Sequence, residues 1–361
     1  MSINDSLSRE PQRMFGKISK NFFDQVIRTN LGAKRNEVVT GPATGVDNCV
    51  IKVGSGEVIV ATTDPLSYIP ELGPEDSAWL SVNLIASDLS TSGFQPQYLV
   101  LDFNLPPTMP DSLFEEYWKA LSRECDLQGI AIVGGHTGRF EGIDSTVIGG
   151  GVMFSIGSSR TYLTSAMGKV GDKIIITKGA GIAATGILAR VFRNSVEKEI
   201  GEDGLKETLK YFRKISTVKD ALSAAAVGVR SLGVNAMHDC TEGGVLTGIR
   251  ELALASSLGV HVYKSEIPVS QETRKICEKF QIDPLVSLGE GALVISCNPQ
   301  RTEMVVNTLA DKGIPASIVG ELKESSYGIR ISDAVGESEL SQPETDPYWK
   351  AYYEAKERGW N

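Results

Sequence analysis

The chain has 361 residues, of which 41% are hydrophobic and 22% charged, with a formal net charge of −9 and a pI near 5.1. This length exceeds one ordinary domain and favours two, each with a substantial core. The acidic balance argues against binding to nucleic acid or to an anionic membrane surface, since both attract basic proteins.

The N-terminal sequence and the cysteines limit the compartment and the kind of metal site. No secretory signal is evident, and no run approaches the roughly 18 apolar residues that span a bilayer, so a cytoplasmic protein is expected. The five cysteines form no C-x-x-C pair, which argues against a disulfide framework or a zinc cluster. Because the chain has three histidines, carboxylates are expected to hold any metal, which favours magnesium or calcium.

The first predicted elements are a helix over residues 21–32 and a β-hairpin. Residues 48–53 and 57–64 are predicted strands, and the Gly-Ser-Gly between them suits a tight turn. The hairpin places Asp47 at the start of one strand and Asp64 at the end of the other. Since these ends are neighbours in an antiparallel pair, the two carboxylates are expected to meet at one edge.

A helix with an apolar stripe is predicted over residues 76–93. Asp88 flanks the stripe near the C-terminal end, where the helix dipole disfavours an anion unless a cation or a hydrogen-bond donor meets it. Asp47, Asp64 and Asp88 could each merely cap or solvate a turn. Together they suit magnesium held by carboxylates and substrate phosphates, and therefore a nucleotide site.

Strands and helices then alternate along the chain. They are predicted over residues 97–105 (strand), 111–129 (amphipathic helix), 130–135 (strand) and 145–157 (strand). Residues 40–160 are therefore expected to form an α+β domain, preceded by an N-terminal segment over residues 1–39.

The sequence GGHTG, which closes the strand over residues 130–135, is a candidate ligand-binding turn. Gly134 and Gly135 would let backbone N–H groups approach a ligand without an intervening side chain. His136, followed by Thr137, could donate to a phosphate or pack as an ordinary polar residue. A tight turn alone would also explain the glycines.

A second unit, an α/β domain, is expected over residues 161–330, followed by a C-terminal tail over residues 331–361. Its loop GAGIAA satisfies the pattern G-x-G-x-x-A of dinucleotide-binding folds. That pattern also needs an acidic residue about 20 positions on, at the end of a second apolar strand. The corresponding stretch, NSVEKEIGEDG, is polar and helix-like, so a dinucleotide-dependent oxidoreductase is a weak alternative.

The sequence HDCTEGG is a more specific signal. An apolar strand delivers Asp239, a short loop carries Thr241, and Gly243 and Gly244 lie at the mouth of a helix, where free N–H groups favour anions. A capping box with a tight turn is the alternative. Capping needs neither paired glycines nor an upstream carboxylate.

Seven motifs, in order, resemble those of the aminoimidazole ribonucleotide (AIR) synthetase superfamily, which includes the carbamoyl dehydratase HypE, thiamine-monophosphate kinase and selenophosphate synthetase. The resemblance spans roughly residues 40–325. The motifs are GVDNC, ATTDPL, ASDLSTSGFQP, GGHTG, GKVGDKIIITKG, MHDCTEGG and LGEGALVI.

The resemblance implies an N-terminal α+β domain whose sheet pairs with that of a second subunit to close a barrel, and hence a homodimer. It also implies a C-terminal α/β domain, with ATP and Mg²⁺ bound between the domains. The implied metal ligands are Asp47, Asp64 and Asp88, and the implied catalytic residues are Asp88, Asp239 and His136. The implied nucleotide-binding residues are Asp47, Asp64, Gly134, Gly135, Thr137, Thr241, Gly243 and Gly244.

The implied chemistry is transfer of the ATP γ-phosphoryl group, which in several members activates an amide-type oxygen. Three departures bear on the substrate. The chain ends without the terminal cysteine that the dehydratase modifies, His136 replaces a carboxylate of the family motif, and Glu242 stands where the dehydratase often has arginine. The absence of a reactive cysteine near the N-terminus argues against selenophosphate synthesis.

The sequence therefore predicts an ATP- and Mg²⁺-dependent phosphoryl-transfer enzyme, similar to HypE but without its terminal cysteine. The expected acceptor is an amide-type or phosphate oxygen of a small-molecule or protein-bound substrate. A nucleotide-binding partner subunit without turnover is the main alternative.

Overall fold

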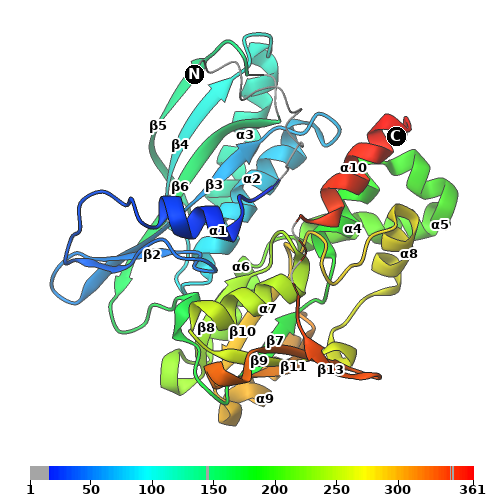
Figure 1. Ribbon diagram of the computed structural model, residues 1–361. Helices are drawn as coiled ribbons and strands as arrows, with labels where there is room; N and C mark the ends of the chain where they lie inside the picture. The colour runs from blue at the N-terminus through cyan, green and yellow to red at the C-terminus, as the bar shows by residue number, and fades with distance from the viewer. Residues whose placement is uncertain (1–15, 144–145, 342, 344) are drawn as a thin grey trace, which may run out of the picture.

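The computed structural model describes residues 16–143, 146–341, 343 and 345–361, which form two sheets with helices packed around them (Figure 1). Within these residues the first sheet has the strand order β1-β2-β3-β6-β4-β5 and the second the order β13-β12-β9-β11-β7-β10-β8. Both sheets are mixed, with one parallel pair each, β4 with β5 and β9 with β12. The prediction of two domains, each with a sheet and helices, is confirmed.

The first domain packs two long helices on one face of its sheet. Its elements are α1 (Lys20–Phe22), the π-helix η2 (Phe23–Ile27), β1 (Val38–Thr40), β2 (Cys49–Lys52), β3 (Glu57–Ser67), α2 (Gly73–Ser90), β4 (Tyr98–Leu105), α3 (Asp111–Leu127), β5 (Ala131–Arg139) and β6 (Val147–Ser158). Strand β3 alternates, since Val58 and Val60 are buried while Ile59 between them is half-buried. The opposite face of the sheet leaves Val152 and Ile156 of β6 exposed.

The second domain carries the larger sheet. Its elements are β7 (Lys173–Thr177), α4 (Ile182–Val191), α5 (Arg193–Leu209), α6 (Val218–Ala226), β8 (Val234–Asp239), α7 (Gly244–Ala255), β9 (Gly259–Tyr263), α8 (Gln271–Phe280), β10 (Leu293–Cys297), α9 (Thr302–Asp311), β11 (Ala316–Lys323), β12 (Ile329–Asp333), β13 (Gly336–Glu339) and α10 (Pro347–Glu357). Strand β8 lies at one edge of this sheet, followed by β10 and then β7. Every residue of β8 and β10 is buried.

Helix α2 belongs to both domains. The predicted apolar stripe is confirmed, because its members pack in the core of the first domain; they are Ala78, Val82, Ile85, Ala86 and Leu89. Leu80, on another side of the helix, packs in the core of the second domain. At the N-terminal end, Asp76 forms ion pairs with Arg190 and Arg213 of the second domain. Near the C-terminal end of α2, Ser87 Oγ accepts the backbone N–H of Thr217 of the second domain over 2.9 Å, so the neighbouring Asp88 lies at the boundary between the domains.

Two expectations about the second domain differ from the structure. Its strands pair antiparallel except for β9 with β12, so it is not a parallel α/β domain; alternation of strands and helices along a chain leaves open the direction in which a strand returns. The tail expected over residues 331–361 is part of the domain. Strands β12 and β13 extend the second sheet, and α10 packs beside α4 and α8 (Figure 1).

Candidate functional site

Besides Glu251, four carboxylates from four separate elements line one pocket of about 780 Å³. Asp47 precedes β2, Asp64 lies within β3, Asp88 lies near the C-terminal end of α2, and Asp239 ends β8. The structure thus brings together carboxylates that the sequence placed at strand and helix ends. Three belong to the first domain and one to the second, so the pocket lies between the domains.

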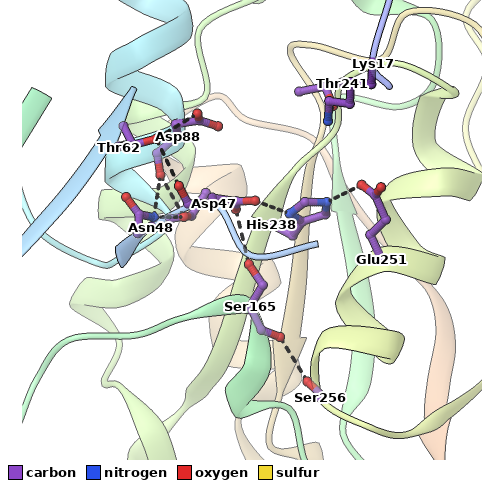
Figure 2. Close-up of polar contacts among 11 residues, drawn as sticks. Lys17, Asp47, Asn48, Thr62, Asp88, Ser165, His238, Thr241, Glu251 and Ser256 are labelled. Carbon is purple, nitrogen blue, oxygen red and sulfur yellow. Dashed lines mark hydrogen bonds and ion pairs between the residues drawn. The ribbon is translucent and has the colours of Figure 1, made fainter. Parts of the chain in front are cut away.

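His238 holds Asp47 from the side of the second domain (Figure 2). Its Nδ1 lies 2.6 Å from Asp47 Oδ1 and its Nε2 lies 3.1 Å from Glu251 Oε2, and the ring is 4% exposed. Burial alone would lower the pKa of His238, but Asp47 and Glu251 outweigh it and raise the pKa well above its usual value. Ser165 Oγ donates to the other oxygen of Asp47. The Asp47 carboxylate is therefore fixed at both oxygens.

Asp88 meets donors despite its unfavourable place in α2. Thr62 Oγ1 donates to Asp88 Oδ2 over 3.1 Å, and Asn48 Nδ2 donates to the backbone oxygen of Asp88 over 2.9 Å (Figure 2). Burial, followed by the charges of Asp239 and Asp47, raises the pKa of Asp88 well above its usual value. When no metal cation lies beside it, the Asp88 carboxyl group therefore favours its protonated form.

Asp64 and Asp239 show the same excess of negative charge. Burial and the neighbouring Asp88 raise the pKa of Asp64 to about 8. Burial and Asp47 raise the pKa of Asp239, whose Oδ1 is buried without a hydrogen-bond partner. Carboxylates crowded in this way, with one orphaned oxygen, fit a divalent cation with oxygen ligands.

A histidine ligand fits less well. Asp47, His238 and Asp239 place potential ligand atoms within 4.8 Å of one another. However, each ring nitrogen of His238 already faces a carboxylate oxygen. We therefore regard His238 as a cationic partner of Asp47 and Glu251, with the carboxylates as the metal-binding groups.

Lys17 reaches the same pocket from the N-terminal segment. Its Nζ donates to Thr241 Oγ1 over 2.8 Å (Figure 2). The side chain of Lys17 is exposed by surface area, yet surrounding protein atoms partly desolvate its ammonium group; Glu251 and Asp239 outweigh this desolvation, and the pKa of Lys17 is raised. Lys17 is thus a cation placed beside Thr241 and the acidic residues.

Free N–H groups were expected at Gly243 and Gly244, at the N-terminus of α7, but the structure pairs both. The Gly243 N–H donates to Asp346 Oδ2 over 2.7 Å, and the Gly244 N–H donates to the backbone oxygen of Thr241 over 3.1 Å. The chain supplies its own carboxylate to this helix end, and both glycine amides are occupied. Sequence reasoning missed Asp346 because it lies about one hundred residues further along the chain.

The GGHTG segment is a strand, and the expected turn is wrong. Gly134, Gly135, His136 and Thr137 lie inside β5, at the edge of the first sheet, and all four are exposed. In the sheet register, two strands separate Gly135 from Asp64, so roughly 14 Å lies between them. Within one chain this segment does not adjoin the carboxylates.

The glycine at position 135 has a structural explanation. Its φ is +155°, and a Cβ there would lie 2.1 Å from the backbone oxygen of Leu101 in the neighbouring strand β4. The close approach that requires a glycine is therefore between two strands. His136 is exposed, and its ring lies 6.5 Å from that of Phe140.

The GAGIAA loop is filled by the chain itself. A Cβ at Gly179 would lie 2.5 Å from the backbone oxygen of Pro268, and one at Gly181 would lie 2.9 Å from Thr273. These glycines allow close packing of neighbouring segments, and they provide no open cradle for a pyrophosphate. The oxidoreductase alternative loses its main support.

The basic residues Arg139 and Lys178, which adjoin the GGHTG and GAGIAA motifs, are engaged outside the pocket. Arg139 donates to the backbone oxygens of Pro106 and Met109 and pairs with Asp111 at the start of α3. Lys178 pairs with Asp220 in a buried position. Both side chains therefore stabilise the fold.

Sequence reasoning missed His238, Glu251 and Lys17 as members of the site. His238 had a usable signal, because it directly precedes Asp239 at the end of an apolar strand. Glu251 lies within the apolar helix α7, and Lys17 lies in a polar stretch without a motif. Neither offers a local pattern.

Comparison with known proteins identifies the family. The N-terminal domain of AIR synthase related proteins matches residues 45–156, and the C-terminal domain matches residues 169–332. The chain therefore belongs to the AIR synthase related family. Among the helices of the described residues, none has the length and apolar character that a membrane span requires.

Three curated relatives illustrate the range of the family. A putative hydrogenase expression/formation protein of Methanocaldococcus jannaschii is 25% identical over 92% of this chain and 96% of its own length. Carbamoyl dehydratase HypE of Azotobacter vinelandii is 25% identical, covering 85% of this chain and 84% of its own. Thiamine-monophosphate kinase of Aquifex aeolicus is 21% identical, covering 67% and 74%.

Solved structures confirm the fold. HypE in complex with ATP superposes with a TM-score of 0.64 at 21% identity, covering 92% of this chain and 97% of that one. AaThiL in complex with AMPPCP and TMP gives a TM-score of 0.67 at 19% identity, covering 88% and 96%.

Proposed function

We propose that this chain is an ATP- and Mg²⁺-dependent phosphoryl-transfer enzyme whose reaction takes place in the pocket between its two domains. The observation that carries the proposal is the crowding of Asp47, Asp64, Asp88 and Asp239 around one pocket, where the pKa values of Asp64, Asp88 and Asp239 are raised and one oxygen of Asp239 has no hydrogen-bond partner. Relatives crystallised with ATP and with AMPPCP support nucleotide as the ligand.

The residues divide the work as follows. Asp47, Asp64 and Asp88 would hold Mg²⁺, with Asp239 beside them. Bound there, Mg²⁺ would neutralise phosphate charge and favour departure of the ADP oxygen. His238 and Ser165 keep Asp47 oriented, so little reorganisation accompanies binding. Lys17 and Thr241 would contact phosphate oxygens at the edge of the carboxylate cluster.

The acceptor is expected to be an amide-type or phosphate oxygen of a small-molecule or protein-bound substrate. Support comes from the names of the relatives, which include carbamoyl dehydratases and a thiamine-monophosphate kinase. A homodimer with a barrel closed from two first-domain sheets, and a cytoplasmic location, remain part of the proposal. In that dimer the edge strand β5, with His136, would be near the second copy.

Calorimetric titration of ATP with and without Mg²⁺ tests the proposal. Binding to the wild type is expected to require Mg²⁺ and to weaken at least about ten-fold in Asp64→Asn and in Asp88→Asn, because each removes a charge near the metal. Asp102→Asn is the matched control, since Asp102 is an exposed carboxylate of the same sheet outside the pocket. Binding that ignores Mg²⁺ and both pocket variants would sink the proposal.

A second measurement separates an enzyme from a nucleotide-binding subunit. ADP release is screened with amide and phosphate-ester acceptors. Release stimulated by an acceptor, and lost in Asp88→Asn, supports turnover. Tight Mg²⁺-dependent ATP binding that no acceptor converts into ADP release would instead indicate a partner subunit.

A further inference from the structure

The two ends of the chain meet at one side chain, Glu242. Its Oε2 accepts the backbone N–H of Lys17 over 2.7 Å, and its Oε1 accepts the indole N–H of Trp349 over 3.0 Å. Lys17 belongs to the N-terminal segment and Trp349 to helix α10. Glu242 itself lies in the loop that joins β8 to α7, next to Thr241 in the pocket wall. Both of its carboxylate oxygens are therefore engaged by segments distant in sequence.

The N-terminal segment, residues 16–31, covers the pocket but is weakly anchored. Lys17, Ile18, Lys20 and Phe23 line the pocket. Within residues 16–31, all of which the structure describes, no residue is buried, and Ile18 is 52% exposed. A segment without buried apolar contacts has little free energy holding it in place, so individual polar contacts decide its position.

Glu242 provides a charged acceptor for one of these contacts. It accepts the Lys17 N–H, and the neighbouring Thr241 accepts the Lys17 ammonium. Gly16 lies against the same carboxylate, since a Cβ at that position would be 2.6 Å from Glu242 Oε1. A hydrogen bond to a charged acceptor stabilises more than a neutral one. The Glu242 carboxylate is thus the anchor of residues 16–31 on the second domain.

Helix α10 fixes the position of that anchor. Trp349 holds one oxygen of Glu242, and Asp346 accepts the N–H of the next residue, Gly243. The helix is itself firmly seated, because it buries four side chains in the second core; they are Tyr348, Ala351, Tyr352 and Ala355. The firmly packed helix α10 thereby orients the Glu242 carboxylate, to which the weakly held segment of residues 16–31 binds.

We propose that Glu242 is a latch that keeps residues 16–31 closed over the pocket, and that Trp349 of the C-terminal helix is the residue that positions this latch. Closure places the Lys17 ammonium beside Thr241, and opening gives access to the pocket. The inference concerns access in the absence of any nucleotide, so it stands independently of the proposed reaction.

The chain contains its own reporter of opening. All five cysteines lie in the described residues, and four of them are buried. Cys49 is half-buried and lines the pocket together with Lys17 and Phe23. The rate at which a maleimide modifies Cys49 in the native protein therefore measures how often the pocket opens. Cys49→Ser identifies the labelled site.

The test compares three variants of the full chain by labelling rate and by Tm. Glu242→Gln is expected to label about ten-fold faster than wild type, since one charge-assisted hydrogen bond changes an opening equilibrium by about that factor. Trp349→Phe, which removes the N–H and keeps an aromatic ring, is expected to label about five-fold faster. Glu242 does not line the pocket, so its effect on Cys49 must pass through the segment.

Trp360→Phe is the matched control. Trp360 follows the same helix and packs on Phe280 and Lys279, away from Glu242. Unchanged labelling in Trp360→Phe, with faster labelling in the other two at unaltered Tm, supports the latch. The proposal is overturned if Glu242→Gln labels at the wild-type rate. It is equally overturned if Trp360→Phe accelerates labelling as much as Trp349→Phe, because general loosening of α10 would then explain both.

Discussion

Two adjoining walls of the site, one lining the pocket and one behind Thr241, treat their polar groups in opposite ways. Around Asp88 and Asp239, carboxylates are crowded, their pKa values are raised, and one buried oxygen has no partner. In the loop from Thr241 to Gly244, the amides of both glycines and both oxygens of Glu242 are paired within the chain.

The difference distinguishes a binding surface from its support. Unbalanced charge in a folded protein costs stability, and such groups are retained where a ligand balances them. A fully paired loop has no such deficit, and it serves to hold neighbouring groups in place. Substitutions in the two walls should therefore have effects of different kind.

The largest effect is expected from Asp239→Asn on the unbalanced wall. We expect a loss of ADP release of at least about 100-fold, because the variant removes a charge from the metal site. Stability without metal should be kept or raised, since a neutral amide replaces a carboxyl whose pKa is raised by burial. ADP release and thermal melts in a chelator measure both quantities. A strong destabilisation without metal would place Asp239 with the supporting wall and break the comparison.

Asp346→Ala probes the paired wall. It removes the acceptor of the Gly243 and Leu288 amides and of the Tyr348 amide at the start of α10. We expect a loss of about 3 kcal/mol in the free energy of unfolding, measured by urea denaturation, from unpaired amides and a lost helix cap.

Anions sharpen this result. Inorganic phosphate should stabilise Asp346→Ala more than the wild type, because the vacated helix end then binds an anion. Equal stabilisation of both proteins would mean that the amides at Gly243 offer no anion site even when freed.

Glu290, which lies near Glu242, tests whether unpaired carboxyl groups also occur next to the loop from Thr241 to Gly244. Burial raises its pKa to about 8, with Glu242 adding to the shift, and its Oε2 is buried without a partner. The folded protein therefore favours the protonated form of Glu290. The contribution of this protonated group to the stability of the fold is complete below the usual pKa of 4.5 and is lost as the pH rises through 8.

Glu290→Gln should remove this dependence. As the pH rises from 5 to 8, the free energy of unfolding of the variant minus that of the wild type is expected to increase by on the order of 2 kcal/mol. Denaturation curves at the two pH values measure the gain. A variant that gains nothing at pH 8 would show that the Glu290 carboxylate is balanced in the fold.

The smallest effect is expected from Arg139→Ala. This residue joins β5 to the start of α3 through Pro106, Met109 and Asp111. We expect a loss of about 1 kcal/mol in stability and no change in ATP affinity. Weakened nucleotide binding at unchanged stability would assign Arg139 to the site after all.

Local patterns in the sequence predicted much of the fold. The β2–β3 hairpin and the buried stripe of α2 follow from periodicity and turn residues, and both are confirmed. The convergence of Asp47, Asp64 and Asp88 was predicted in part by the hairpin geometry and in part by family resemblance. Their roles, like those of Asp239 and Thr241, stay predictions.

Long-range contacts set the limit. The Lys17 backbone bonds to Glu242 across 225 residues, and Gly243 bonds to Asp346 across 103, so no local pattern announces either contact. Gly135 shows how a glycine misleads. It predicted a backbone open to a ligand, whereas it is required by the close approach of strand β4.

Helix α2 has a consequence for how the chain folds. Because its stripe fills one core and Leu80 the other, and Asp76 is bridged to two arginines across the boundary, neither domain is complete without it. The two halves should therefore melt as a single cooperative unit in calorimetry. A cut between them would leave α2 with the first half and remove Leu80 from the core of the second, so the second half is expected not to fold without the first.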